Sequence, residues 1–244
     1  MKRVIIRNTL ITLGLFMVIS FSSQAMEVNG GANFYFTNNY FWRITTLNVE
    51  DPHVQYDFSP SASVGKLGVS FTPWISYNLS KKEADEIDYT LDLSYPLNNS
   101  ISTNIGAIYY DVTGAVETIE MYGSLGYSTE IAKLLSISPG LKFYYDVKEI
   151  KKGYIEPSIS LSTPKFPYIS LSSILGIDLG QFALPNENGE LVADTKLTTL
   201  QIGLSGKYEV YKGVTVIPSF TYVIGLHDGI DNTSYAGLKF SFAF

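Results

Sequence analysis

The chain has 244 residues, a formal net charge of −6, no cysteine, and a composition that is 45% hydrophobic and 14% aromatic. The acidic balance argues against a nucleic-acid binder, whose surface is basic. The lack of cysteine excludes disulfides, thiol chemistry and cysteine-based metal sites. The length fits one domain, and beyond the N-terminal region the sequence has no run of roughly 20 apolar residues that would form a transmembrane helix.

The first residues have the layout of a secretory signal peptide. Three basic residues lie within residues 1–7, an apolar run covers residues 10–21, and small residues surround a cleavage position after Ala25. The run is shorter than the roughly 20 residues of a membrane anchor. We therefore expect residues 1–25 to be removed near Ala25. The mature domain would be residues 26–244, with a charge of about −9, because three basic residues and no acidic one leave with the signal.

Beyond residue 33, apolar and polar residues alternate in one segment after another, as expected of strands with one apolar and one polar face. The clearest case is residues 87–95, where two carboxylates, Asp88 and Asp92, alternate with aliphatic and aromatic neighbours. In chain order the alternating segments cover residues 33–37, 53–58, 67–77, 87–95, 101–109, 119–128, 137–146, 155–161, 168–179, 199–208, 214–226 and 233–244. The pattern predicts about 12 strands.

The connections between these segments are of two kinds, which alternate along the chain. Short ones lie near residues 63–65, 97–100, 130–133, 163–167 and 209–213, and longer, more charged ones near residues 44–52, 80–86, 112–116, 147–153, 180–196 and 227–232. Outer-membrane barrels alternate short periplasmic turns with longer extracellular loops, and strands in lipid must close into a barrel. We predict an all-β fold, a transmembrane up-and-down antiparallel β-barrel in the outer membrane of a Gram-negative bacterium. A soluble β-sandwich is the alternative.

The last predicted strand ends on an aromatic residue. Phe240, Phe242 and Phe244 share its apolar face, whereas Lys239 lies on the opposite face. Outer-membrane barrels commonly end in this way, and the ending resembles the signal that the barrel-insertion machinery reads. The expected partners are therefore outer-membrane lipid and the barrel-assembly machinery, with small solutes as cargo.

The start of the barrel resembles the TorF-type porins. The resemblance rests on FTNNYFWR at residues 36–43, PHVQ at residues 52–55, GVS at residues 68–70 and WIS at residues 74–76. The sequence departs from the family pattern in carrying Asn-Asn in place of Ser-Asp, Ile44 in place of glycine, and no Gly-Cys-Trp. The resemblance implies an outer-membrane location and a channel role.

If every apolar face points outward, the alternation also assigns a lumen. The ionisable residues predicted to face it are Arg43, His53, Asp57, Asp88, Asp92, Glu120, Lys142, Asp146, Glu156, Asp178, Lys207 and Lys239. Their balance is mildly acidic, so an open lumen would favour cations or neutral solutes. Alternatively, the charges pair across a small barrel and fill it, because unpaired buried charges are costly. Arg43, the only arginine after the signal, would either narrow the pore or lock the first hairpin; we favour the lock, with Asp57 as the candidate partner.

These patterns predict a narrow passive channel, a porin for small solutes or cations. Large inward residues, including Trp74 and Tyr122, would narrow it, and the connection over residues 180–196 could fold inward or remain outside. A non-conducting barrel with structural or adhesive loops is an alternative from another class. A membrane-embedded lipid hydrolase is a third, although neither histidine, His53 or His227, lies in the His-x-Ser-Asn pattern of the outer-membrane phospholipases. We expect no enzyme activity, cofactor or metal.

Overall fold

The computed structural model describes residues 27–46, 51–115, 117–131, 133–163, 165, 168–186 and 188–244. The predicted signal peptide, residues 1–25, lies outside these residues. Among the described residues, no helix is long and apolar enough to cross a membrane.

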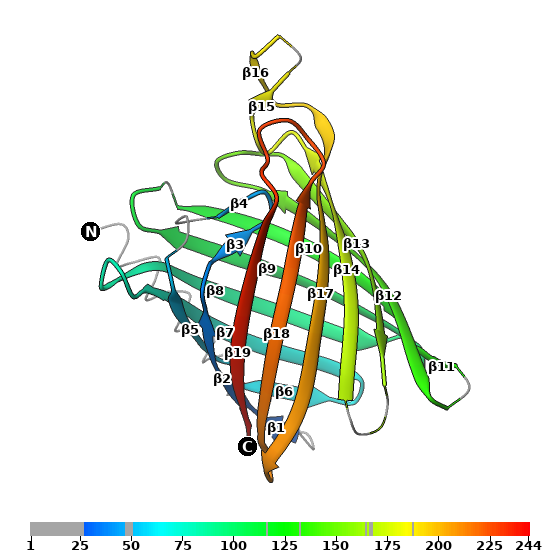
Figure 1. Ribbon diagram of the computed structural model, residues 1–244. Coiled ribbons are helices and arrows are strands. Elements are labelled where there is room, and N and C mark those ends of the chain that lie inside the picture. Colours follow the sequence, from blue (N-terminus) through cyan, green and yellow to red (C-terminus); the bar gives the residue numbers. More distant parts are fainter. Residues whose placement is uncertain are drawn as a thin grey trace.

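Twelve antiparallel strands close into a barrel in which each strand pairs with its neighbours in the sequence and the last pairs with the first (Figure 1). The strands are β2 (Gly31–Thr37), β5 (His53–Phe58), β7 (Leu67–Asn78), β8 (Glu83–Pro96), β9 (Ile101–Val112), β10 (Thr118–Tyr127), β12 (Leu135–Asp146), β13 (Gly153–Ser162), β14 (Tyr168–Leu179), β17 (Thr195–Tyr211), β18 (Val214–Gly225) and β19 (Thr233–Ala243). Closure leaves no open sheet edge along the barrel wall. The predicted fold class is confirmed.

Seven short strands complete the fold. β6 (Ser61–Val64) follows β5 on the same side of β7 and holds β1 (Glu27–Asn29), and β11 (Thr129–Ile131) follows β10 along β12. Two hairpins lie in long connections: β3 (Phe41–Trp42) with β4 (Thr45–Thr46), and β15 (Leu184–Pro185) with β16 (Leu191–Val192). The second hairpin projects beyond the end of the barrel, at the top of Figure 1.

The two ends of the barrel differ, and we name them by their connections. The long-loop end carries the connections over residues 38–52, 79–82, 113–117, 147–152, 180–194 and 226–232, and the short-turn end carries those over residues 65–66, 97–100, 132–134, 163–167 and 212–213. The halves of the lumen next to these ends are called the long-loop half and the short-turn half.

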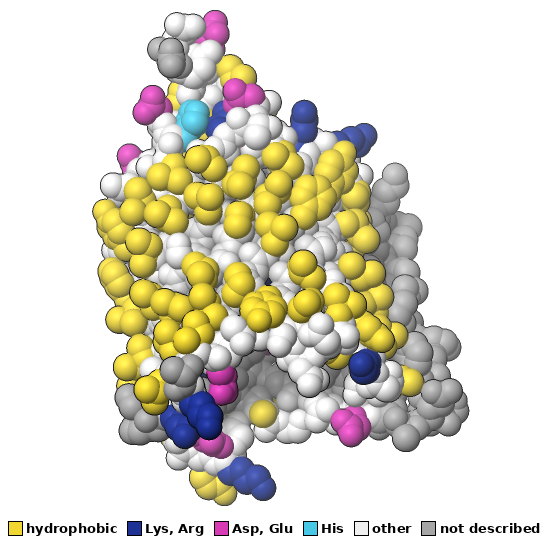
Figure 2. All heavy atoms as spheres, turned by 90° about the vertical axis from the view of Figure 1, so that its right-hand side faces the viewer, with side chains coloured by type: hydrophobic (Ala, Val, Ile, Leu, Met, Phe, Trp, Pro, Cys, Tyr) yellow, Lys and Arg dark blue, Asp and Glu magenta, His cyan; other side chains and the backbone are white. Residues whose placement is uncertain are grey.

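The outer wall is apolar. Ile105, Leu125 and Leu204 are 59%, 51% and 52% exposed there, although burying such side chains would be favourable by about 1.5–3 kcal/mol each. Hydrophobic side chains form a broad belt on the face drawn in Figure 2, with charged side chains above and below it. An exposed apolar area of this extent marks a surface that is covered by something other than water.

The seam between the first and last strands is joined by aromatic pairs on the outer face. Phe240 packs edge-on against Phe36, and Phe242 packs edge-on against Phe34. Phe244 reaches past β2 and stacks on Phe58 of β5, with 5.8 Å between ring centroids. Aromatic pairs contribute about 0.5–1.5 kcal/mol beyond their area burial. The alternation of the C-terminal residues therefore has a structural use in closing the barrel.

One predicted connection is wrong in its bounds. Strand β8 begins at Glu83, so most of the connection expected over residues 80–86 belongs to the strand. A register shift between Ser76 and Tyr77 of β7 brings Ser76 opposite Glu86 and Tyr77 opposite Ala84, which leaves Asp85 as an extra residue. A bulge of this kind interrupts strict alternation, so Glu83 and Ala84 are out of phase with the alternation that runs from Glu86 onward.

Candidate functional site

The predicted lumen residues fall into two groups. Arg43, His53, Asp88, Glu120, Lys142, Asp146, Glu156 and Asp178 lie nearer the long-loop end, and Asp57, Asp92, Lys207 and Lys239 lie nearer the short-turn end. In the first group, five of the eight residues are at most 5% exposed. None of the second group is among the buried polar residues of the described chain. The two halves of the lumen are therefore filled differently.

The long-loop half is occupied by the first long connection, whose β3–β4 hairpin turns at Arg43. The backbone of Arg43 has a φ of +54°, a left-handed conformation that costs a non-glycine residue roughly 1–2 kcal/mol. Such strain persists only where surrounding contacts hold it in place. The Arg43 carbonyl accepts a hydrogen bond from Thr199 Oγ1 at 3.2 Å, which ties the turn to strand β17.

The guanidinium of Arg43 binds both oxygens of Glu120. Nη1 donates to Oε1 and Nη2 donates to Oε2, each at 2.7 Å. Nη1 also donates to Gln181 Oε1 at 2.7 Å, and Gln181 Nε2 donates to Glu120 Oε1 at 2.8 Å. Tyr110 donates to the second oxygen of Glu120 at 2.9 Å. This network satisfies a buried ion pair, which is the condition under which one is tolerated.

Aromatic rings surround the guanidinium. Its Cζ lies 4.6 Å, 4.5 Å and 4.8 Å from the ring centroids of Trp42, Tyr144 and Tyr154. Phe182 contacts both Trp42 and Tyr154. Burial alone would lower the pKa of Arg43, but the hydrogen bonds and charge of Glu120 raise it above its usual value, so the group stays charged.

We call the set Trp42, Arg43, Glu120, Gln181 and Phe182 the clasp, because it joins the first long connection, strand β10 and the start of the connection after β14. The expected pairing of Arg43 with Asp57 is wrong. Asp57 instead accepts hydrogen bonds from Asn33 Nδ2 at 2.8 Å and Ser59 Oγ at 3.2 Å. Arg43 lies on a long connection that folds away from the first hairpin, so its partner comes from the far wall.

Two predicted lumen carboxylates hold loops rather than line an open path. Asp146, which is fully buried, accepts backbone N–H bonds from residues 148–151 through Oδ1 and a short hydrogen bond from Thr118 through Oδ2. Asp178 accepts the backbone N–H groups of Gln181 and Phe182 at 2.7 Å and 3.1 Å. Each carboxylate fixes the start of a long connection by local side-chain to backbone bonding, and Asp178 thereby places two members of the clasp.

The histidines are engaged with oxygen atoms. His53 is fully buried, with Nδ1 at 2.8 Å from the Asp51 carbonyl and Nε2 at 2.9 Å from Asp85 Oδ2. His227 Nδ1 lies 2.7 Å from the carbonyl of Asp228. A serine hydrolase needs a histidine nitrogen within hydrogen-bond reach of the serine, and the ring nitrogens of His53 are both occupied.

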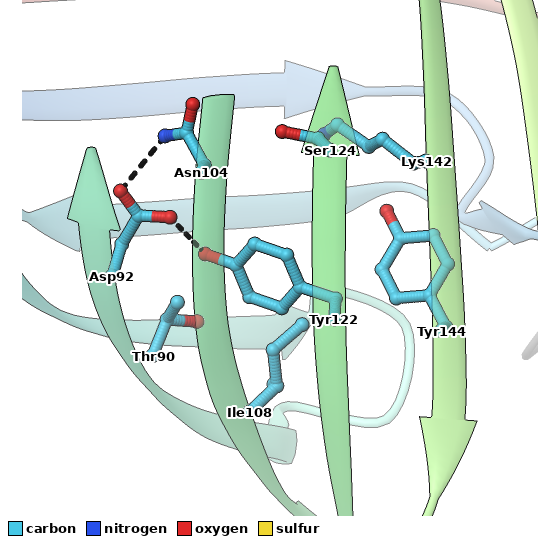
Figure 3. Close-up of a pocket in the computed structure, with 8 residues that line it drawn as sticks. All are labelled: Thr90, Asp92, Asn104, Ile108, Tyr122, Ser124, Lys142 and Tyr144. Atoms are coloured by element: carbon cyan, nitrogen blue, oxygen red, sulfur yellow. Dashed lines mark hydrogen bonds between the residues drawn. The ribbon is translucent and has the colours of Figure 1, made fainter. Parts of the chain in front are cut away.

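A cavity of about 320 Å³ lies near the middle of the barrel and extends into the short-turn half. Its lining residues come from four neighbouring strands and are Thr90, Asp92, Asn104, Ile108, Tyr122, Ser124, Lys142 and Tyr144 (Figure 3). Asp92 accepts a hydrogen bond from Asn104 Nδ2 at 2.9 Å and a short one from the Tyr122 hydroxyl. A Cβ at Gly106 would lie 2.5 Å from Cζ of Tyr122, so the glycine leaves room for the ring to cross the strand toward Asp92.

The other predicted lumen charges have separate contacts. Glu156 lies directly opposite Lys142 across strands β12 and β13 and hydrogen-bonds to Tyr144. Lys207 is exposed, and the Lys239 ammonium lies 4.9 Å from the ring centroid of Tyr35. The two predicted carboxylates of the short-turn half, Asp57 and Asp92, are matched by these two lysines, so this half is balanced in charge.

Several residues of the long-loop half were not predicted from the sequence. Glu86 continues the alternation of Asp88 and Asp92 by one step and could have been found by extending that pattern as far as the bulge at Asp85. Gln181 and Phe182 lie in a connection whose direction the sequence left open. In the structure these two residues pack inward, whereas the β15–β16 hairpin of the same connection projects outward.

Comparison with solved structures places this architecture among outer-membrane barrels. The chain superposes on the COG4313 outer membrane channel from Pseudomonas putida F1 with a TM-score of 0.53 and 7% identity, covering 89% of this chain and 95% of that one. It superposes on the KdgM porin with a TM-score of 0.54 and 9% identity, over 88% and 99% of the two chains. LpxR from Salmonella typhimurium gives 0.56 and 8%, over 87% and 99%.

The class of protein is thus an outer-membrane-type β-barrel with porin-like structural neighbours. At these identities the likeness establishes the fold alone. No family model matches the sequence, and no curated protein matches it. The resemblance to TorF-type porins stays a prediction.

Proposed function

We propose that this protein is a narrow passive channel of the bacterial outer membrane, a porin for small solutes whose path is restricted by the clasp. The observation that carries the proposal is a closed barrel with an apolar outer belt and a polar interior that retains a cavity. The COG4313 protein is described as an outer membrane channel, and KdgM as a porin, which supports a channel role for the same architecture.

The orientation in this proposal follows the connections. Long loops face the exterior and short turns face the periplasm in outer-membrane barrels, so the clasp would lie at the extracellular side. A second pocket of about 600 Å³ lies at the long-loop rim and is lined by Asn38, Asn39, Pro52, Thr233 and Ser234. The clasp adjoins the cavity through Tyr144, which lines it and packs against the Arg43 guanidinium. A solute path would connect the rim pocket and this cavity when the clasp opens.

The expected preference for cations stays a prediction, and fewer accessible carboxylates support it than the sequence indicated. Five of the seven carboxylates on which it rests lie in the long-loop half, where Glu120 is paired with Arg43, and Asp146 and Asp178 are occupied by loop backbone. The accessible short-turn half has equal numbers of predicted carboxylates and lysines. We therefore propose passage of small solutes, with at most a weak preference for cations.

The decisive test is single-channel conductance of the refolded protein in planar bilayers. We expect infrequent, small steps from the wild-type protein, and larger, longer steps from the Arg43→Ala/Glu120→Gln variant, which opens the clasp without leaving a buried unpaired charge. A matched control is Lys239→Met, which changes a lumen charge outside the clasp and should conduct as the wild type does. If neither the wild-type protein nor the double variant gives steps at any voltage, the channel proposal fails.

That negative result would favour the second candidate, a non-conducting barrel whose loops provide structure or adhesion. The specific observation in its favour is the dense packing of the clasp together with the outward β15–β16 hairpin. The hydrolase hypothesis receives no comparable support from the contacts of His53 and His227. Ester or lipid hydrolysis that is lost in a His53→Ala variant would revive it.

A further inference from the structure

Behind the first long connection, unpartnered buried polar atoms concentrate on three adjacent strands. Among the described residues, four such atoms are Gln55 Nε2, Ser76 Oγ, Glu86 Oε2 and Asp88 Oδ1. Ser76 is fully buried and Glu86 is 3% exposed. Unsatisfied groups at this density are unusual in native proteins, and a bound ion or water is the ordinary explanation.

The strand register brings these side chains together. Gln55 of β5 lies directly opposite Ser76 of β7, and Ser76 lies directly opposite Glu86 of β8. Directly opposed side chains have Cβ atoms about 4.5–5.5 Å apart. Asp88, two residues after Glu86, is on the same face and is hydrogen-bonded to it. The hydroxyl of Ser76 therefore faces the same small space as the two carboxyl groups.

Tyr40, from the first long connection, covers this space from the lumen side. Its hydroxyl hydrogen-bonds to Glu86, and its ring lies 5.6 Å from Trp74 and 5.7 Å from His53 between centroids. Burial raises the pKa of Tyr40 well above its usual value, and the charge of Glu86 adds to the shift. The phenol therefore stays neutral and serves as a donor to a negatively charged site.

In the described part of the chain, no cation is paired with these two carboxyl groups. Arg43 is held by Glu120, and His53 is held by Asp85. Two acidic groups in hydrogen-bond contact need a proton or a cation between them, because like charges at this separation repel strongly in a low dielectric.

We propose that Glu86, Asp88 and Ser76 bind a small divalent cation within the barrel wall, beneath Tyr40. The ligand atoms are hard oxygens, which favour calcium or magnesium over softer metals. A 180° rotation of the Gln55 amide would add a fourth oxygen, since amide nitrogen and oxygen are assigned rather than observed. No group of three His, Cys, Asp or Glu side chains suited to a metal occurs in the part of the chain that the structure describes, so water completes the shell of two carboxylates and neutral oxygens.

The cation would hold the first long connection to β8, and the clasp holds the same connection to β10 on the far wall. This proposal does not depend on conduction, because a non-conducting barrel could hold the same ion.

Terbium luminescence tests the site directly, since Trp74 lies directly opposite Asp88 and can sensitise a terbium ion bound there. The refolded full chain is treated with a chelator and titrated with terbium, then with calcium. We expect saturable sensitised emission that calcium displaces, at least a tenfold weaker apparent affinity in Glu86→Gln and in Asp88→Asn, and no change in Asp92→Asn. Calcium should also raise the thermal unfolding temperature of the wild-type protein and of Asp92→Asn, but not of the two site variants.

Folding of each variant is checked by its heat-dependent shift in gel mobility. Emission that persists in both site variants would place terbium on surface loop carboxylates and overturn the proposal. Absence of saturable emission from the wild-type protein, with no calcium effect on its unfolding, would also overturn it. In that case the two carboxyl groups only share a proton.

Discussion

The long-loop and short-turn halves of the lumen are built from the same strands and receive the same kinds of side chain, but they place them in different surroundings. In the long-loop half, the β3–β4 hairpin and residues 181–182 pack against the wall, so that Arg43 and Glu120 are buried there and each has several hydrogen-bond partners. In the short-turn half, no described connection folds inward, and the side chains border a cavity. A charge that points inward is thus structural or accessible according to whether a loop covers it.

The largest expected effect comes from breaking the clasp on one side only. Arg43→Ala leaves Glu120 buried without its counter-charge, and such a change typically costs about 3–5 kcal/mol. Arg43→Ala/Glu120→Gln should recover most of that loss, because no uncompensated charge remains. Urea unfolding of the refolded protein, followed by tryptophan fluorescence, measures both. A loss under about 1 kcal/mol for Arg43→Ala would contradict the claim that the clasp stabilises this half.

A smaller loss is expected at a loop anchor of the same half. Asp146→Ala removes the acceptor of four backbone N–H groups and of Thr118, and leaving buried donors unsatisfied costs about 1–3 kcal/mol. Asp146→Asn is the matched control, since it retains an oxygen at Oδ1 and should lose less. Limited proteolysis within residues 147–152, alongside urea unfolding, reports whether the connection loosens. Equal stability of the alanine and asparagine variants would mean that the oxygen acceptor is unimportant.

The same contrast explains what could be predicted from the sequence. Alternation along residues 87–95 or 214–226 follows directly from a wall with an apolar and a polar face. The number of strands, the closure of the barrel and the division into long and short connections could therefore be predicted. The partner of Arg43 was not, because Arg43 and Glu120 are 77 residues apart and the direction of a loop leaves no periodic signal. Glu86 is in phase with Asp88 and could have been predicted, whereas the bulge at Asp85 puts Ala84 out of phase, since one extra residue reverses the alternation before it.

An effect of intermediate size is expected on ion selectivity, and it should differ between the two halves of the lumen. Asp92 borders the cavity of the short-turn half, whereas Asp88 lies behind Tyr40, so Asp92→Asn should shift the reversal potential toward anions and Asp88→Asn should leave it nearly unchanged. The measurement is the zero-current potential of the conducting Arg43→Ala/Glu120→Gln background under a salt gradient. Equal shifts from the two variants would show that Asp88 also faces the conducting path and that the division of the lumen is wrong.

The smallest effect is expected at Lys239, in the short-turn half. Its ammonium lies over the Tyr35 ring, and a cation–π contact of this kind contributes about 0.5–1 kcal/mol at an exposed site. Lys239→Met keeps much of the side-chain length and apolar contact while removing the charge, so the loss should stay under about 1 kcal/mol. Tyr35→Leu should cost a similar amount, and the double variant should cost less than the sum of the two single losses, because they remove the same contact. A loss of unfolding free energy comparable to that of Arg43→Ala would mean that contacts in the short-turn half stabilise the protein as much as the clasp does.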